Sequence, residues 1–118
     1  MTKIKVTIEG GRTLVADLVD NQATQALVDR LPLTITMDSL YGREMCHRFG
    51  RSGLPADQAK ETGYKVGDIS YWLPMGSLVF LYEQNGEVFE QQPLGHFEGH
   101  VSFMRDLGTV AVTLEQAN

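Results

Sequence analysis

The apolar region between Val66 and Tyr82, which reads VGDISYWLPMGSLVFLY, constrains the fold of this chain more than any other segment. Its second half contains the continuous apolar run Leu78–Leu81, typical of a strand that is buried on both faces. Its first half, residues 69–73, alternates imperfectly and carries two aromatic side chains that suit either a core or a pocket wall. A Pro-Met-Gly-Ser bend separates the halves, so we predict two neighbouring strands at the centre of the fold.

The rest of the chain contains further short apolar segments that indicate strands. Apolar residues alternate with polar ones, as in half-buried strands, over residues 3–9, 13–18, 33–37 and 109–114. Less regular strands are expected over 44–49 and 93–97. We expect Gly10-Gly11 to close one β-hairpin, and Asn85-Gly86 to close another between the strand ending near Tyr82 and a short segment at 87–89.

Two short helices are expected between these strands. Asp20-Asn21 offers an N-cap for a helix from about Asn21 to Arg30, and Pro32 stops it. Val101, Met104 and Leu107 predict a second helix, which Gly108 closes. The intervening stretch from Gly50 to Gly67 is expected to be a polar loop with at most one helical turn around residues 57–61.

About eight short antiparallel strands with two short capping helices favour a mainly β fold in the form of a closed barrel. Closure hides the strand edges that such a chain would otherwise expose, and an open sandwich is the alternative. The 118 residues contain no linker or repeat, which favours one domain over residues 1–118.

Charge and cysteine content narrow the class of protein. The net charge is -5 and the basic residues are scattered, which argues against a nucleic-acid partner. The sequence has no signal-peptide core and no segment of membrane-spanning length, so no membrane partner is expected. Cys46 is the only cysteine, which excludes an intrachain disulfide and favours a cytoplasmic location.

Three segments resemble those of the cyclophilins. Cys46-His47-Arg48-Phe49 resembles their Phe-His-Arg-Ile strand. Residues 67–70 and 77–81 resemble their Gly-x-Leu-Ser and Ser-Gln-Phe-Phe-Ile strands, and residues 94–99 resemble Phe-Gly-Lys-Val-x-x-Gly. The chain as a whole is similar to compact bacterial cyclophilin-like proteins of uncharacterised function. This resemblance implies a cyclophilin-like barrel over nearly the whole chain.

The resemblance also implies site residues. Arg48 matches the arginine with which cyclophilins stabilise the twisted prolyl bond, and is the candidate catalytic residue. Phe80 matches a pocket phenylalanine, although its position in a buried apolar run favours the core. Gln91 lies nearest the position of the pocket histidine. Tyr71 and Trp72 are expected to line the same groove, although Trp72 lies where cyclophilins carry a small residue.

The chain departs from the cyclophilin pattern around this groove. Residues 50–55 lack the Phe-Met pair and the glutamine that follow the cyclophilin arginine, and the pocket tryptophan falls in a region shortened here to 84–92. We therefore expect a module that binds a peptide segment or small molecule. The alternative is a weak peptidyl-prolyl isomerase that uses Arg48.

No metal or cofactor is predicted. His96, Glu98 and His100 flank a glycine and do not share a helical face, and Gly10-Gly11 precedes no helix that could hold a phosphate. Cys46 and His47 are neighbours on a strand and therefore face opposite sides, which argues against a nucleophile pair.

Overall fold

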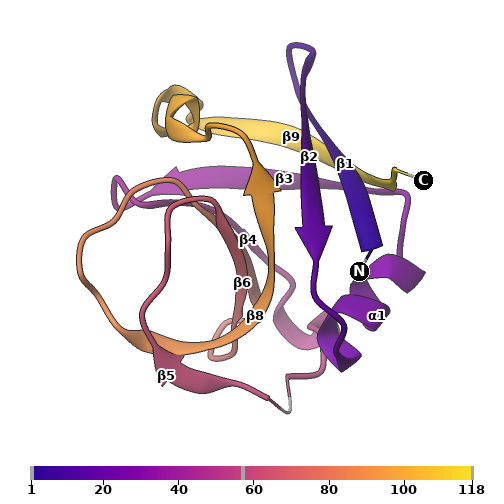
Figure 1. Ribbon diagram of the computed structural model, residues 1–118. Helices are drawn as coiled ribbons and strands as arrows, with labels where there is room; N and C mark the ends of the chain where they lie inside the picture. The colour runs from indigo at the N-terminus through magenta and orange to yellow at the C-terminus, as the bar shows by residue number, and fades with distance from the viewer. Residues whose placement is uncertain (1, 57, 118) are drawn as a thin grey trace.

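The computed structural model describes residues 2–56 and 58–117, and within them the chain forms a mainly β structure (Figure 1). The strands are β1 (Thr2–Ile8), β2 (Arg12–Leu18), β3 (Leu33–Leu40), β4 (Glu44–Arg48), β5 (Lys60–Thr62), β6 (Asp68–Trp72), β7 (Ser77–Leu81), β8 (Phe89–Glu98) and β9 (Thr109–Gln116). The helical elements are α1 (Gln22–Asp29) and two 3₁₀ helices, η1 (Gly50–Ser52) and η2 (Ser102–Asp106).

Eight of these strands close into an antiparallel barrel. Their order is β2-β1-β9-β3-β4-β7-β6-β8, and pairing between β2 and β8 completes the ring. The short strand β5 pairs only with the first part of β8 and lies outside the ring. The prediction of a closed barrel of about eight strands is therefore confirmed, and the open sandwich is excluded.

The alternation in the sequence explains how the first hairpin faces the core. Ile4, Val6 and Ile8 of β1 are all buried, and β1 pairs with β2 so that Ile8 lies opposite Arg12. Gly10 and Gly11 have φ angles of 103° and 105°, which favour glycine and allow the tight turn. This hairpin projects beyond the barrel in Figure 1.

Only one of the two expected helices is an α-helix. Asn21 caps α1 by accepting a hydrogen bond from the backbone N–H of Thr24, while the Thr24 hydroxyl accepts one from the backbone N–H of Asn21. The expectation of a second such helix was wrong, because residues 102–106 form the 3₁₀ helix η2. Apolar residues at 101, 104 and 107 recur every three residues, which matches the three residues per turn of a 3₁₀ helix.

The expected hairpin at Asn85-Gly86 does not form. Strand β7 pairs with β4 and β6, whereas β8 pairs with β6, β2 and β5, so β7 and β8 are not neighbours. The turn itself is present, since the Asn85 side chain accepts a hydrogen bond from the backbone N–H of Glu87 and Gly86 has a φ of 82°. A local turn signal therefore did not decide which strands pair. Residues 83–88 instead form a long connection that arcs away from the barrel (Figure 1).

The stretch between Gly50 and Gly67 is more ordered than the sequence pattern indicates. It contains η1 and the strand β5, and several side-chain contacts hold it to the rest of the chain. The backbone N–H of Leu54 donates to Tyr71 Oη at 2.9 Å, and the backbone N–H of Gln58 donates to Gln92 Oε1 at 2.9 Å. These contacts come from residues distant in sequence, which is why a local pattern could not reveal them.

Two apolar clusters form on opposite faces of the same strands. The larger fills the barrel interior and includes Phe80 and Phe97, whose rings meet edge to face with centroids 4.9 Å apart. The smaller lies on the outside of β4 and β7 and contains Cys46, Tyr64, Val79 and Leu81, with Leu40 and Phe89 packed against it. All five residues of β7 are buried, which confirms the prediction of a strand covered on both faces.

Candidate functional site: a pocket on the outer face of the barrel

Register places three side chains of different strands in one row on the outer face. Arg48 of β4 lies opposite Ser77 of β7, and Ser77 lies opposite Trp72 of β6. Residues that are directly opposite in an antiparallel pair point to the same face, with Cβ atoms roughly 4.5–5.5 Å apart. On the same outer face, the neighbouring pair, two residues away along β4 and β7, is Cys46 and Val79.

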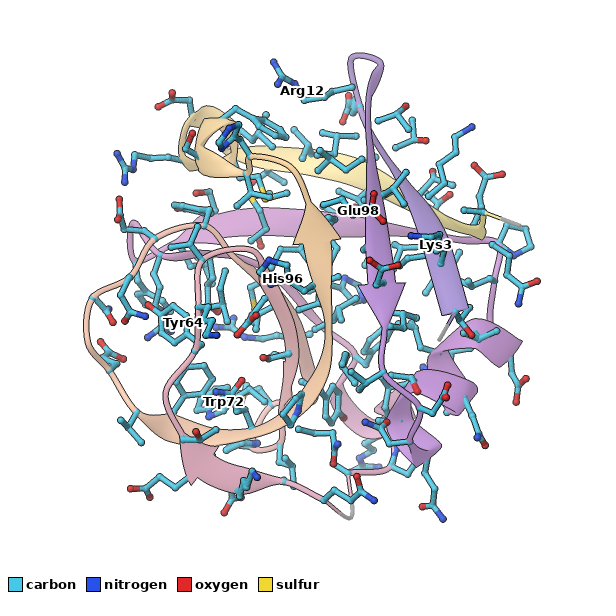
Figure 2. All side chains as sticks on the ribbon, in the orientation of Figure 1. Lys3, Arg12, Tyr64, Trp72, His96 and Glu98 are labelled. Carbon is cyan, nitrogen blue, oxygen red and sulfur yellow. The ribbon has the colours of Figure 1, made fainter. Side chains whose placement is uncertain are left out.

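A pocket of about 120 Å³ lies on this face. Its apolar lining comes from Cys46, Trp72, Val79 and Phe89. The connection between β7 and β8 contributes Glu87 to the same pocket, so a segment outside the barrel helps to enclose it. Figure 2 shows Trp72 and Tyr64 on the side of the molecule away from α1.

Three charged side chains gather at one end of this pocket. Arg43 Nε donates to Glu44 Oε1 at 2.8 Å, and another nitrogen of the same guanidinium is paired with Glu87. The Arg43 and Glu44 side chains are 13% and 6% exposed, whereas that of Glu87 is 57% exposed. Burial raises the pKa of Glu44 above its ordinary value, and the charge of Arg43 acts in the opposite direction. We call Arg43, Glu44 and Glu87 the charged cluster.

Arg48 lies at the other end of the pocket, roughly 13 Å from Glu44 between Cα atoms at the usual rise of a strand. Among residues 2–56 and 58–117, no hydrogen bond or ion pair engages its guanidinium. Its side chain is exposed at one side and lines the pocket at the other. Arg48 is therefore a permanent cation at the entrance that the described side chains do not neutralise by direct contact.

Ser77 is the one described side chain with a buried polar atom that lacks a hydrogen-bond partner. Its hydroxyl interacts with the Cys46 thiol and lowers the pKa of that thiol, but the two groups do not have hydrogen-bond geometry. A thiol is in any case a weak partner for a hydroxyl. Burial has the larger effect on Cys46 and raises its thiol pKa above the ordinary value, so the thiol is protonated at neutral pH.

The structure places two of the residues predicted to line the groove on the inner face instead. Phe80 is 1% exposed and belongs to the barrel core. Tyr71 is also part of that core, and its hydroxyl anchors the backbone of Leu54. A Cβ atom added to Gly53 would approach Tyr71 Oη to 2.0 Å, so the loop fits closely over this hydroxyl. Both side chains are separated by their strands from the pocket that contains Arg48 and Trp72.

Gln91 lies on the outer face beside Trp72 but outside the pocket lining. It is 2% exposed, and its amide is fully used. Its oxygen accepts a hydrogen bond from the Ser70 hydroxyl, and its nitrogen donates to the carbonyl oxygens of Thr62 and Gly63 at 3.2 and 3.0 Å. Gln91 therefore joins β5 and its following turn to the barrel.

Sequence reasoning did not identify the charged cluster or Ser77 as parts of a site. Glu44, Cys46 and Arg48 share one face because they are alternate residues of a strand, and that signal was available in the sequence. Ser77 and Glu87 could not be found in this way. Their positions depend on the pairing of β4 with β7 and on the path of the connection between β7 and β8.

The described residues show no group of three His, Cys, Asp or Glu side chains placed to hold a metal ion. His96, considered above for metal binding, instead has its Nδ1 2.9 Å from Asp68 Oδ1. No helix in this part of the chain combines the length and apolar character needed to cross a bilayer.

Comparison with solved structures shows the same fold in proteins of very different sequence. The hypothetical protein AF2241 from Archaeoglobus fulgidus, determined in solution, superposes with a TM-score of 0.74 at 14% identity and covers 98% of this chain and 95% of its own. McbB, determined in complex with tryptophan, gives a TM-score of 0.69 at 14% identity, covering 98% of this chain and 45% of its own. No curated protein sequence matches the chain significantly.

A family model shows the protein family, which these distant structures do not. The model of the cyclophilin-like family matches residues 6–115, which span every strand that closes the barrel except the first residues of β1 and the last of β9. The match agrees with the resemblance to the cyclophilins and with the closed barrel. The chain therefore belongs to the cyclophilin-like family.

Proposed function

We propose that this protein is a binding module whose outer-face pocket takes a small apolar group of a peptide or small molecule. The observation that carries this proposal is the partly enclosed pocket whose apolar lining includes Trp72 and which is bordered by the guanidinium of Arg48. Apolar cavities of about 150 Å³ in other proteins hold one benzene molecule. A pocket of about 120 Å³ therefore takes roughly one small ring or a short aliphatic chain.

The size of the pocket favours a fragment of a ligand over a large molecule. Sites for drug-sized ligands usually enclose about 300–1,000 Å³. The proline ring and other small side chains of a peptide meet the size limit, as do small acids and amides. Arg48 then binds the polar atoms next to the enclosed group, because its guanidinium presents several donors in a planar fork.

One comparison supports a small molecule as the occupant. The structurally similar McbB was determined with tryptophan, which combines a ring with charged groups. At 14% identity, that likeness supports the class of occupant and not tryptophan itself.

A second candidate function is weak peptidyl-prolyl isomerase activity. It is supported by the position of Arg48, which lies beside a pocket of the size of a proline ring. A guanidinium that hydrogen-bonds the prolyl amide would stabilise the twisted transition state more than the planar ground state. The burial of Phe80 in the barrel core removes the aromatic floor that the cyclophilin resemblance implied, so we favour binding without turnover.

An isomerisation assay separates the two functions. A proline-containing peptide is incubated with wild type, with Arg48→Ala and without protein, and the rate of cis–trans exchange is measured. We expect equal rates in the three samples, together with saturable quenching or enhancement of Trp72 fluorescence by the peptide. Catalysis well above background that Arg48→Ala abolishes would overturn the binding-only function. The absence of both catalysis and binding of small apolar ligands would overturn both candidates.

We also propose a cytoplasmic location. The lone thiol of Cys46 is free, buried and protonated, which suits a reducing compartment. Fractionation of cells that express the tagged protein tests this location, and recovery outside the cytoplasmic fraction would overturn it.

A further inference from the structure

Two hydrogen-bond donors lie side by side in the pocket without a protein acceptor. Arg48 and Ser77 are directly opposite in the pairing of β4 with β7, and both line the pocket. The described residues supply no hydrogen bond or ion pair to the Arg48 guanidinium, and the Ser77 hydroxyl is 1% exposed and unpartnered. A buried hydroxyl without a partner costs free energy. Its presence beside a free guanidinium therefore indicates that a ligand accepts hydrogen bonds from both groups.

We infer that the group recognised in this pocket is the carboxylate of a small apolar monocarboxylic acid, bound by the Arg48 guanidinium and the Ser77 hydroxyl. This inference rests on the proposed binding function and names the class of its ligand. The apolar body of the acid lies against Trp72, Val79 and Phe89. The Ser77 hydroxyl is buried in the unliganded protein, so contact with a carboxylate oxygen requires rotation about χ1 toward the pocket.

The number of donors favours a carboxylate over other anions. A carboxylate has two oxygens and pairs with one guanidinium in a planar, bidentate arrangement, and one additional hydroxyl can serve a remaining lone pair. A phosphate group presents three oxygens and up to two negative charges. Among the described residues of the pocket, only Arg48 is a cation without a partner, so the second charge would not be neutralised. The protein's net charge of -5 also disfavours a dianion.

The opposite end of the pocket sets a further limit on the ligand. The charged cluster has one positive and two ionisable negative side chains, and Arg43 is already engaged by both carboxylates. A second carboxylate on the ligand would approach this cluster and be repelled by it. The pocket therefore selects monocarboxylates over dicarboxylates, and it orients them with the carboxylate at Arg48.

An isosteric pair of probes tests this inference directly. Cyclopentanecarboxylate and cyclopentanecarboxamide share a five-membered ring that suits a cavity of about 120 Å³, and they differ in charge. Trp72 is the only tryptophan of the chain, so its fluorescence reports binding at this pocket alone. We expect the acid to bind at least about tenfold more tightly than the amide in the wild type, as for hydrogen bonds to a charged group.

Three variants assign that preference to named groups. Arg48→Gln is expected to abolish it, Arg48→Lys to retain part of it, and Ser77→Ala to weaken acid binding several-fold. Arg12→Gln is the matched control, because Arg12 lies over the Phe103 ring at 4.0 Å and well away from Trp72 (Figure 2). It removes the same charge from the protein and should leave the preference unchanged. Circular dichroism and thermal unfolding establish that each variant is folded.

The outcomes separate this inference from the function on which it rests. Equal affinities for acid and amide, or a preference that survives Arg48→Gln, would overturn carboxylate recognition and leave the binding function standing. Wild-type affinity of Ser77→Ala for the acid would overturn the role of the hydroxyl alone. No response to the acid, the amide or a proline-containing peptide would overturn the binding function itself. Peptides ending in a free or an amidated proline show whether the carboxylate is that of a peptide terminus or of a free acid.

Discussion

The two faces of β4, β7 and β6 perform different tasks although they share the same backbone. On the inner face, Met45, Phe80 and Ile69 are each 1% exposed and belong to one continuous core. On the outer face, the same strands present Arg48, Ser77 and Trp72, and a pocket remains between them and the segments that cover them. The inner face is filled, whereas the outer face is only partly filled and keeps polar groups without partners.

This difference shows where stability and binding are located. A closed barrel must fill its interior, since a void there loses contacts with nothing to replace them. The outer face is free of that requirement, because separate segments of the chain cover it. Substitutions on the inner face should therefore alter stability, and substitutions in the row of Arg48 and Ser77 should alter binding at little cost to stability.

The largest effect on stability is expected from Phe80→Ala. It removes a buried ring that meets Phe97 and leaves a cavity, and should lower the free energy of unfolding by about 3–5 kcal/mol. Urea unfolding followed by circular dichroism measures the change, and Phe80→Leu is the milder control at about 1 kcal/mol. A loss below 1 kcal/mol in Phe80→Ala, or loss of ligand binding in a folded Phe80→Leu, would show that the two faces are not separate.

Arg43→Met should have the next largest effect. It leaves the buried carboxylate of Glu44 without its cation, and we expect a loss of about 3 kcal/mol at pH 8. Glu87→Gln removes the exposed partner of the same arginine and should cost less than about 1 kcal/mol. Urea unfolding of the two variants compares them, and equal losses would contradict the importance of burial within the charged cluster.

The Arg43→Met loss should also depend on pH. The pKa of Glu44 is already raised by burial, so the folded state binds this proton more tightly than the unfolded state does. Stability then falls as pH rises from the ordinary carboxyl pKa to the raised one. Without Arg43 the pKa rises further, so this decline extends to higher pH. The variant should be less destabilised near pH 4 than at pH 8, and a pH-independent loss would be evidence against this account.

Ser77→Ala is expected to change stability little, or to raise it by up to about 1 kcal/mol. The substitution removes a buried hydroxyl that has no hydrogen-bond partner in the described chain. Ser70→Ala is the matched control on the same face, because the Ser70 hydroxyl donates to Gln91 Oε1. Its loss leaves that oxygen unsatisfied and should cost about 1–2 kcal/mol in urea unfolding. Equal losses in the two variants would mean that Ser77 is satisfied within the protein.

The smallest effect is on the rate at which the Cys46 thiol is alkylated. This rate is measured in the wild-type protein, without any substitution. Burial raises the pKa of the thiol, so the reactive thiolate becomes abundant only at a pH above its ordinary range. Alkylation by iodoacetamide at pH 8 should be at least about tenfold slower than that of a free thiol and should accelerate as pH rises. A bound monocarboxylate should slow it further. Rapid alkylation at pH 7 would show that the outer face is open to solvent.

Much of the architecture followed from local pattern. Alternation in β1, β2, β3 and β9 predicted half-buried strands, and the apolar run in β7 predicted a strand covered on both sides. Which side chains of β6 and β7 face inward was less evident, because Leu78–Leu81 is continuously apolar and Trp72 interrupts the alternation in β6. Phe80 and Tyr71 were therefore considered both for a groove and for the core, and the structure places them in the core. In β4, by contrast, the two-residue spacing of Cys46 and Arg48 was enough to predict that both side chains lie on one face of the strand.

The sequence by itself determined the period of each strand, the cap of α1, the closed β-rich class and the cyclophilin-like resemblance. These depend on near neighbours in the chain, through backbone sterics, local hydrogen bonds and alternation. Only the tertiary structure decided that Arg48 and Ser77 lie side by side, that Glu87 reaches Arg43, and that β7 and β8 do not pair. Those contacts join residues 29–44 positions apart, and pairing between strands, which no local signal specifies, brings them together.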